Sequence, residues 1–294
     1  MIPRILDRAS FPSALGGIDE SELPETITVS GDIEANGTRT IAIVGSRKIS
    51  DTGIAWVQDL ARGCAMRGAI VVSGGALGAD RAAHEGALSF SKGRTWAVLG
   101  TGCEHEYPAP KHENDNAIYG HIAEREGCSL VWPFEAGREA MPQNFPYRNR
   151  ILVALADVVV VAQAGDRSGS LNAARHAREQ GKPIWIMPAA PWEKGFEGSW
   201  TIFHLGARIL HDRDAFLDEV LPGRRPEILQ EPPTHRGMNE TESLLLGAAS
   251  KSPMHVDDLC EAVGLSPSAV MTALLTLASE HVLVEGPPGY YRKA

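Results

Sequence analysis

Three short stretches of this sequence combine small residues, arginines and free backbone N–H groups: Ile41–Lys48 (IAIVGSRK), Phe145–Arg150 (FPYRNR) and Ser168–Leu171 (SGSL). The first is an apolar strand pattern that breaks into a Gly-Ser-Arg turn, and the third follows a second apolar run, Asp157–Gln163. Small residues between the carboxyl end of a strand and the amino end of a helix leave N–H groups free for an anion. Arginine adds planar donors that match phosphate oxygens. These stretches therefore predict a phosphate-binding site and leave open whose phosphate it holds.

A fourth stretch, Ser73–Asp80 (SGGALGAD), places three glycines after another apolar run. Glycine at such positions lets the backbone approach a ligand closely, and close packing of a helix on the sheet explains it equally well. The spacing is neither the GxGxxG dinucleotide fingerprint nor a Walker loop ending in Gly-Lys-Ser/Thr. Binding of NAD or ATP is therefore disfavoured.

The stretch FPYRNR is the most specific of these signals. Arg148 and Arg150 lie two residues apart, and Phe145 and Tyr147 alternate with them. Guanidinium groups for phosphates and aromatic faces for bases suit a single nucleic-acid strand. A solvated charged loop is the alternative explanation for this stretch. We expect a helix over Arg150–Ala156.

No catalytic or metal-binding constellation accompanies these motifs. Glu104, His105, Glu106 and His84 lack the HExxH spacing of a zinc site, and no GxSxG elbow is present. The four cysteines are too far apart for a zinc knuckle or a redox CxxC pair. We expect a protein that binds its ligand without catalysis and needs neither a metal nor a cofactor.

The bulk composition is that of an ordinary globular protein of 294 residues, with 43% hydrophobic and 22% charged residues. A formal net charge of −9 opposes non-specific binding of nucleic acid over the whole surface, so a polyanion must meet a local basic patch. The sequence has no apolar stretch of transmembrane length. We expect a cytoplasmic protein without a membrane partner.

Short β-rich runs alternate with helical patterns from residue 40 onward, which predicts an α/β fold. The runs are Thr40–Val44, Ala69–Val72, Thr95–Leu99, Cys128–Trp132, Val158–Ala162 and Pro183–Met187. Continuous apolar runs joined by helices are typical of an extended Rossmann-like, doubly wound, mostly parallel sheet. In such sheets the ligand lies outside the carboxyl ends of the strands, where all the motifs above fall.

We divide the chain into four segments. Residues 1–39 form an extended lead-in that packs on the core, residues 40–221 the Rossmann-like domain, residues 222–239 a linker and residues 240–294 a small winged-helix domain. The third helix of the winged-helix pattern, Pro267–Ser279, would be its recognition helix, but it contains no lysine or arginine, and acidic residues surround it. Because phosphate contacts need basic side chains, a protein–protein role suits this domain better than DNA reading.

In their order along the chain, these motifs resemble those of the DprA/Smf DNA-processing family. The matching stretches are Ile41–Ser50 (IAIVGSRKIS), Ser73–Leu88 (SGGALGADRAAHEGAL), Thr95–Pro108 (TWAVLGTGCEHEYP), Phe145–Arg150 (FPYRNR) and Ser168–Arg175 (SGSLNAAR). The resemblance covers about residues 11–210 and, more loosely, the winged helix. It implies a homodimeric protein that binds single-stranded DNA, protects incoming DNA and loads the recombinase RecA during natural transformation, without being an enzyme.

The motifs and the resemblance together give a set of candidate residues for binding phosphate or single-stranded DNA. They are Gly45, Ser46, Arg47, Lys48, Ser73, Gly74, Gly75, Phe145, Arg148, Asn149, Arg150, Arg167, Ser168, Gly169 and Ser170.

Four positions depart from the family's usual residues. They are Leu77 in place of Arg, Lys111 in place of Asn, Gln163 in place of Glu and Trp200 in place of Asn. These departures keep open a second hypothesis, a Rossmann-like sensor of a nucleotide-derived small ligand. A third, an enzyme similar to phosphoribohydrolases, is disfavoured because the stretch Gly165–Ser170 lacks the glutamate of that family.

Overall fold

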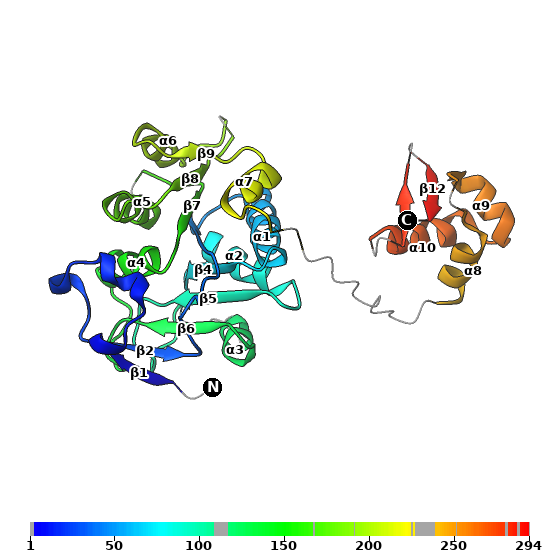
Figure 1. The fold of residues 1–294 in the computed structure, drawn as a ribbon. Coiled ribbons are helices and arrows are strands. Elements are labelled where there is room, and N and C mark those ends of the chain that lie inside the picture. The colour runs from blue at the N-terminus through cyan, green and yellow to red at the C-terminus, as the bar shows by residue number, and fades with distance from the viewer. Residues whose placement is uncertain are drawn as a thin grey trace. The chain divides into compact units, whose positions relative to one another are not determined.

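The computed structural model describes residues 3–108, 117–166, 168–190, 192–224, 226, 239–250, 252–279, 282–286 and 289–293. The chain divides into two compact units, Met1–Ile228 and Leu229–Ala294 (Figure 1). Each unit has its own hydrophobic core.

A nine-stranded sheet organises the larger unit. Its strand order is β1-β2-β6-β5-β4-β3-β7-β8-β9, and every neighbouring pair from β6 to β9 is parallel. The strands are β1 Arg4–Asp7, β2 Thr26–Ser30, β3 Thr40–Gly45, β4 Ile70–Gly74, β5 Arg94–Val98, β6 Ser129–Trp132, β7 Val158–Ala162, β8 Ile184–Met187 and β9 Arg208–Ile209. The predicted Rossmann-like, mostly parallel fold is confirmed.

The strand order reverses direction at the centre of this sheet. From β3 the chain runs through β4, β5 and β6 on one side, then returns to place β7, β8 and β9 on the other. The loops that leave the adjacent strands β3 and β7 therefore diverge and leave a crevice at their carboxyl ends. Such a switch point is where open α/β sheets bind ligands.

Helices cover both faces of the sheet, as Figure 1 shows: α4, α5 and α6 lie on one face, and α1, α2, α3 and α7 on the other. Their bounds are α1 Asp51–Met66, α2 Ala79–Leu88, α3 Ala117–Glu124, α4 Asn144–Ala154, α5 Gly169–Glu179, α6 Gly198–His204 and α7 Arg213–Val220. The central strands β3 and β7 are sandwiched between these layers, and burial on both faces explains the apolar runs Ile41–Val44 and Val158–Ala162.

Residues 4–30 take a larger part in the sheet than their composition predicts. Strands β1 and β2 pair with each other and β2 pairs with β6, all antiparallel. Ile27 and Val29 of β2 are fully buried. The many glycines, prolines and acids around this short strand mask its pattern in the sequence.

The stretch FPYRNR forms the first turns of a helix, and the predicted start of that helix at Arg150 was wrong. Helix α4 begins at Asn144, so Pro146 occupies its first turn. Proline is tolerated there because the first N–H groups of a helix have no partner within it. The aromatic and charged residues hide the helical period, because the buried face of α4 includes Arg148 and Asn149.

The smaller unit has winged-helix architecture. Helices α8 (Glu240–Ala248), α9 (Val256–Val263) and α10 (Pro267–Ser279) pack with a three-stranded sheet of β10 (Met254–His255), β12 (Tyr290–Lys293) and β11 (Leu283–Glu285). Asn239 and Glu242 form a reciprocal capping box at the start of α8. Gly264 ends α9 with a φ of 67°, a conformation that glycine adopts without strain.

Within the described residues, no single helix is long and apolar enough to cross a membrane. The helices Val256–Val263 and Pro267–Ala278 together have the length and apolar composition of a membrane span, but the axis bends by 111° between them.

The packing of α1 on α2 gives a test of this fold. A Cβ added at Gly86 of α2 would overlap the backbone of Gln58 in α1, whereas nothing lies within 4 Å of a Cβ added at Gly120 of α3. We expect Gly86→Ala to lower the free energy of unfolding by about 1–3 kcal/mol through overpacking. Gly120→Ala should raise it by up to about 1 kcal/mol through helix propensity. Urea denaturation measures both, and equal effects would contradict this packing.

Candidate functional site

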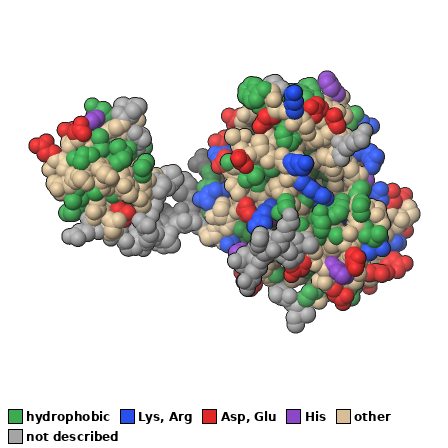
Figure 2. All heavy atoms as spheres, turned by 180° about the vertical axis from the view of Figure 1, so that it is seen from behind, with side chains coloured by type: hydrophobic (Ala, Val, Ile, Leu, Met, Phe, Trp, Pro, Cys, Tyr) green, Lys and Arg blue, Asp and Glu red, His purple; other side chains and the backbone are tan. Residues whose placement is uncertain are grey.

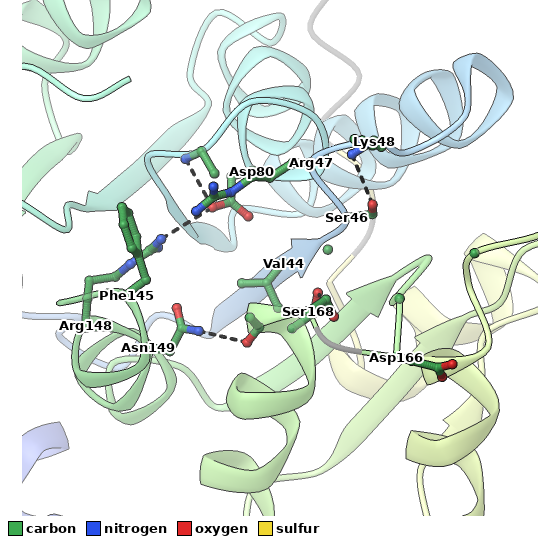
Figure 3. A pocket seen from close by; sticks show the side chains of 16 residues that line it. Val44, Ser46, Arg47, Lys48, Asp80, Phe145, Arg148, Asn149, Asp166 and Ser168 are labelled. Atoms are coloured by element: carbon green, nitrogen blue, oxygen red, sulfur yellow. Dashed lines mark hydrogen bonds and ion pairs between the residues drawn. The ribbon is translucent and has the colours of Figure 1, made fainter. Parts of the chain in front are cut away.

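A cavity of about 460 Å³ opens at the switch point (Figure 3). The loops after β3 and β7, the amino ends of α2 and α5, and one face of α4 surround it. Its lining is Val44, Gly45, Ser46, Arg47, Lys48, Ala76, Asp80, Phe145, Arg148, Asn149, Gly165, Asp166, Ser168, Gly169, Ser170 and Gly195.

The turn after β3 is held close to the neighbouring strand. A Cβ on Gly45 would overlap the carbonyl oxygen of Ala162 in β7, and the N–H of Ser46 donates to that same oxygen at 3.1 Å. The N–H of Ala79, at the start of α2, donates to the carbonyl of Ser46 at 3.1 Å. These bonds direct the side chains of Arg47 and Lys48 outward, where both are exposed.

Arg148 lies at the back of the cavity, buried on α4 with a side chain only 4% exposed. Its Nη2 is 3.7 Å from Oδ2 of Asp80, too far for a hydrogen bond. Among the described residues, its Nε and Nη1 meet no hydrogen-bond acceptor. Gly74 is required beside it, because a Cβ there would overlap both the guanidinium and the Asp80 carboxylate.

Burial opposes both charges of this pair. It raises the pKa of Asp80, against the attraction of Arg148, and it lowers the pKa of Arg148, against the attraction of Asp80. Arg148 stays a cation because guanidinium deprotonates only far above neutral pH. A buried cation with unused donors is costly, so an oxyanion in the cavity would satisfy it.

The amino end of α5 forms the opposite wall. Among the described residues, the side chain of the N-cap residue Ser168 makes no capping hydrogen bond, and its hydroxyl lies 3.1 Å from that of Ser170. Asn149 of α4 donates its Nδ2 to the carbonyl of Gly169 at 2.9 Å, which fixes α5 against α4. An uncapped helix start carries partial positive charge and free N–H groups, and both favour an anion.

Aromatic rings and cations stand together at the mouth of the cavity. The guanidinium of Arg47 is 5.1 Å from the ring centre of Phe145 and 6.0 Å from that of Tyr107. The two rings pack against each other with centres 4.8 Å apart. Figure 3 shows Arg47, Asp80 and Arg148 approaching one another from three different elements. Figure 2 shows basic side chains among hydrophobic ones near the middle of one face of the larger unit.

The structure brings most of the predicted residues together and places others behind the cavity. Ser73, Gly74 and Gly75 do not line it: the hydroxyl of Ser73 donates to the carbonyl of Ile43, and the two glycines make room for neighbouring side chains. Arg150 faces the other way, and its Nη2 lies 3.0 Å from Oε1 of Glu22. Arg167 lies outside the described residues.

Sequence reasoning missed several lining residues, chiefly Asp80 and Asp166. Asp80 closes the stretch SGGALGAD, and its position in the first turn of α2 was the available signal, since acids are favoured there. Gly195 lies in the loop after β8, and no pattern in the sequence marks it.

The four departures from the family pattern have different surroundings. Leu77 is 49% exposed in the loop beside the cavity, and Trp200 is 41% exposed on α6. Gln163 is buried with a positive φ of 49°, accepts from the N–H of Ser50 at 2.9 Å and donates to its hydroxyl at 2.9 Å. It therefore joins the end of β7 to the start of α1. Lys111 lies outside the described residues.

Across the described part of the chain, no group of three or more His, Cys, Asp or Glu side chains could hold a metal ion. The side chains that line the cavity include three cations, three serine hydroxyls and one amide as hydrogen-bond donors, and this donor set suits an oxyanion.

The fold is that of a Rossmann-like protein with a C-terminal winged helix, and the chemistry of its cavity suits an anion. The family model of DNA recombination-mediator protein A matches residues 4–221, and that of the DprA winged helix domain matches residues 230–277. The chain belongs to the DNA recombination-mediator protein A family, and the resemblance seen in its motifs is confirmed.

Individual relatives agree with this assignment. Protein Smf of Escherichia coli (strain K12) is 31% identical over 291 residues, covering 97% of this chain and 76% of that protein. The structure of DNA processing protein A from Streptococcus pneumoniae matches with a TM-score of 0.64 at 29% identity, over 74% of each chain. A structure of the Helicobacter pylori protein, described for its single-stranded DNA binding mode, matches with a TM-score of 0.65 at 26% identity. That match covers 76% of this chain and 97% of that one.

His84 is buried behind the cavity, and it makes the stability of the fold depend on pH. Its Nε2 lies 2.9 Å from the carbonyl of Gly74 and its Nδ1 lies 2.7 Å from the hydroxyl of Thr95, and burial lowers its pKa from 6.5 to about 4. The unfolded chain therefore binds more protons than the folded protein between these values. The stability that His84 contributes is present above pH 6.5 and is lost as the pH falls to about 4.

Between pH 6.5 and pH 4, the free energy of unfolding should fall by on the order of 3 kcal/mol less in His84→Gln than in the unchanged protein. The glutamine amide can still donate to the carbonyl of Gly74, and it does not titrate. Urea denaturation of both proteins at pH 6.5 and pH 4 measures this difference. Identical losses of stability in the two proteins would contradict a neutral, buried His84.

Proposed function

We propose that this protein binds single-stranded DNA through the cavity at the switch point, without sequence specificity and without catalysis. The observation that carries the proposal is the buried Arg148, which has two unpaired donor atoms and lines the same cavity as the uncapped start of α5. A DNA phosphate would accept from the guanidinium and from the helix N–H groups together.

The surroundings of this anchor favour a strand over a free anion. Arg47 and Lys48 are exposed at the mouth, where they would meet neighbouring phosphates. The ring of Phe145 lines the same cavity, and an aromatic face stacks on any base. Because the net charge of the chain is −9, attraction to a polyanion would be confined to this patch.

The family membership extends the proposal to biological role. We infer that the protein protects incoming single strands, loads RecA onto them in transformation and recombination, and acts as a homodimer. The Helicobacter pylori structure, described for its single-stranded DNA binding mode, supports the DNA part of this proposal. RecA and the second copy rest on the family resemblance.

A sensor of a nucleotide-derived small ligand is the second candidate. Two observations favour it: a cavity of about 460 Å³ is within the size range of small-molecule sites, and Leu77 adds no cation beside it.

Fluorescence anisotropy of a labelled oligothymidine separates the two candidates, with duplex DNA and thymidine monophosphate as competitors. Binding that weakens steeply with salt and that the mononucleotide displaces poorly is expected for a strand binder. Displacement by micromolar mononucleotide, or no binding of the oligonucleotide, would establish the sensor in its place.

Arg47 tests the mouth of the site without disturbing the core. We expect Arg47→Ala to weaken binding of every oligonucleotide sequence and to lower the slope of log K against log salt by about 0.7, the value for one phosphate contact on a single strand. Arg4→Ala makes the same change of charge on β1, at the far edge of the sheet, and should leave the slope unchanged. Equal changes of affinity and slope in the two variants would show that binding depends on the net charge of the protein and not on this site.

Leu77 allows a test by gain of affinity. Its exposed side chain stands next to Ala76, which lines the cavity. We expect Leu77→Arg to raise the salt slope by about 0.7 and the affinity for oligothymidine by about fivefold at 0.1 M salt, because it adds one phosphate contact. Leu77→Gln is the uncharged control. An unchanged slope would mean that this loop does not face the strand.

A further inference from the structure

A second hollow adjoins the cavity, between α5 and α6. Its volume is also about 460 Å³, and apolar side chains line much of it, among them Leu171, Ile184, Ile202 and Leu205. Leu205 is 48% exposed. We refer to this hollow as the α5/α6 groove.

The groove is continuous with the cavity at the amino end of α5. Ser168 lines both, and Gly169 and Ser170 line the cavity immediately beside it. A ligand strand with one phosphate at the start of α5 could therefore continue from the cavity into the groove.

Cations stand along the groove on the same face of α5. Ser168, Leu171, Arg175 and Arg178 are spaced by three or four residues, so they lie in one row on the helix. Arg175 is partly compensated, because its Nε lies 3.9 Å from Oε1 of Glu179. Within the described residues, Arg178 has no carboxylate partner, and its side chain is exposed.

We propose that the α5/α6 groove is a second subsite for the same DNA strand, which would leave the cavity past Ser168 and run along α5. The bases would lie on the apolar side chains, and Arg178 and Arg175 would meet the phosphates. This inference rests on the proposed binding of single-stranded DNA. Charge complementarity and continuity with the cavity favour a nucleic-acid strand over a protein segment as the occupant.

The test compares oligothymidines that fill only the cavity with longer ones, using fluorescence anisotropy on the full chain. With a 12-mer, we expect Arg178→Ala to lower the affinity about fivefold at 0.1 M salt and the salt slope by about 0.7. With a 3-mer, the same variant should bind as the unchanged protein does. Leu205→Glu places a negative charge at the groove and should weaken only the 12-mer. Arg47→Ala should weaken both lengths, and Arg4→Ala neither.

Three results would overturn the inference. The first is a 12-mer affinity that neither groove variant changes, which leaves the cavity as the whole site. The second is an equal loss of affinity for the 3-mer and the 12-mer in the groove variants, together with a change of oligomeric state in analytical ultracentrifugation. That result would make the groove a contact between two copies of this chain. The third is no binding of any oligonucleotide to the unchanged protein, which refutes the proposed function as well.

Discussion

The buried pair of Arg148 and Asp80 constrains the rest of the site. Two opposite charges lie in the interior 3.7 Å apart, and the carboxylate does not use all the donors of the guanidinium. Desolvation of such a pair costs more than a long, incomplete contact returns. The folded protein tolerates this cost because the surrounding elements leave the pair no other position. Gly74 leaves the guanidinium its space, and the backbone N–H of Ala76 lies 3.3 Å from the carboxylate.

Two further features of the switch point determine where that guanidinium lies relative to the start of α5. The tight turn at Gly45 brings β3 against β7, which opens the crevice, and Asn149 fixes the start of α5 opposite Arg148. Both donor sets are therefore already in place in the protein alone, so a ligand that bound them would cost little conformational entropy. Exposed cations at the mouth add attraction at longer range. In the proposed function, this arrangement would let an acidic protein bind a polyanion at one place on its surface.

The sequence predicts the strands and the phosphate motifs because those signals are local. The apolar runs of β3 and β7 and the glycine turns after them can be recognised directly in the sequence. The orientation of the side chains in FPYRNR cannot be recognised in the sequence, because it depends on whether the stretch is helical. In a helix, residues two apart point to nearly opposite sides, so Arg148 faces the cavity while Arg150 reaches Glu22. Strand β2 was missed for a different reason: its pairing with β1 and β6, rather than a local pattern, makes that short segment a strand.

The central claim is that Arg148 is the anchor for a DNA phosphate, and side-chain ¹⁵N NMR of the arginines tests it most directly. In a titration with a short oligothymidine, the Nε–H signal of Arg148 should shift strongly and exchange more slowly with water as its unused donors find phosphate oxygens. The Nε–H signal of Arg150 should stay in place, because that side chain pairs with Glu22 away from the cavity. Binding of the oligonucleotide with the Arg148 signal unchanged would contradict the account.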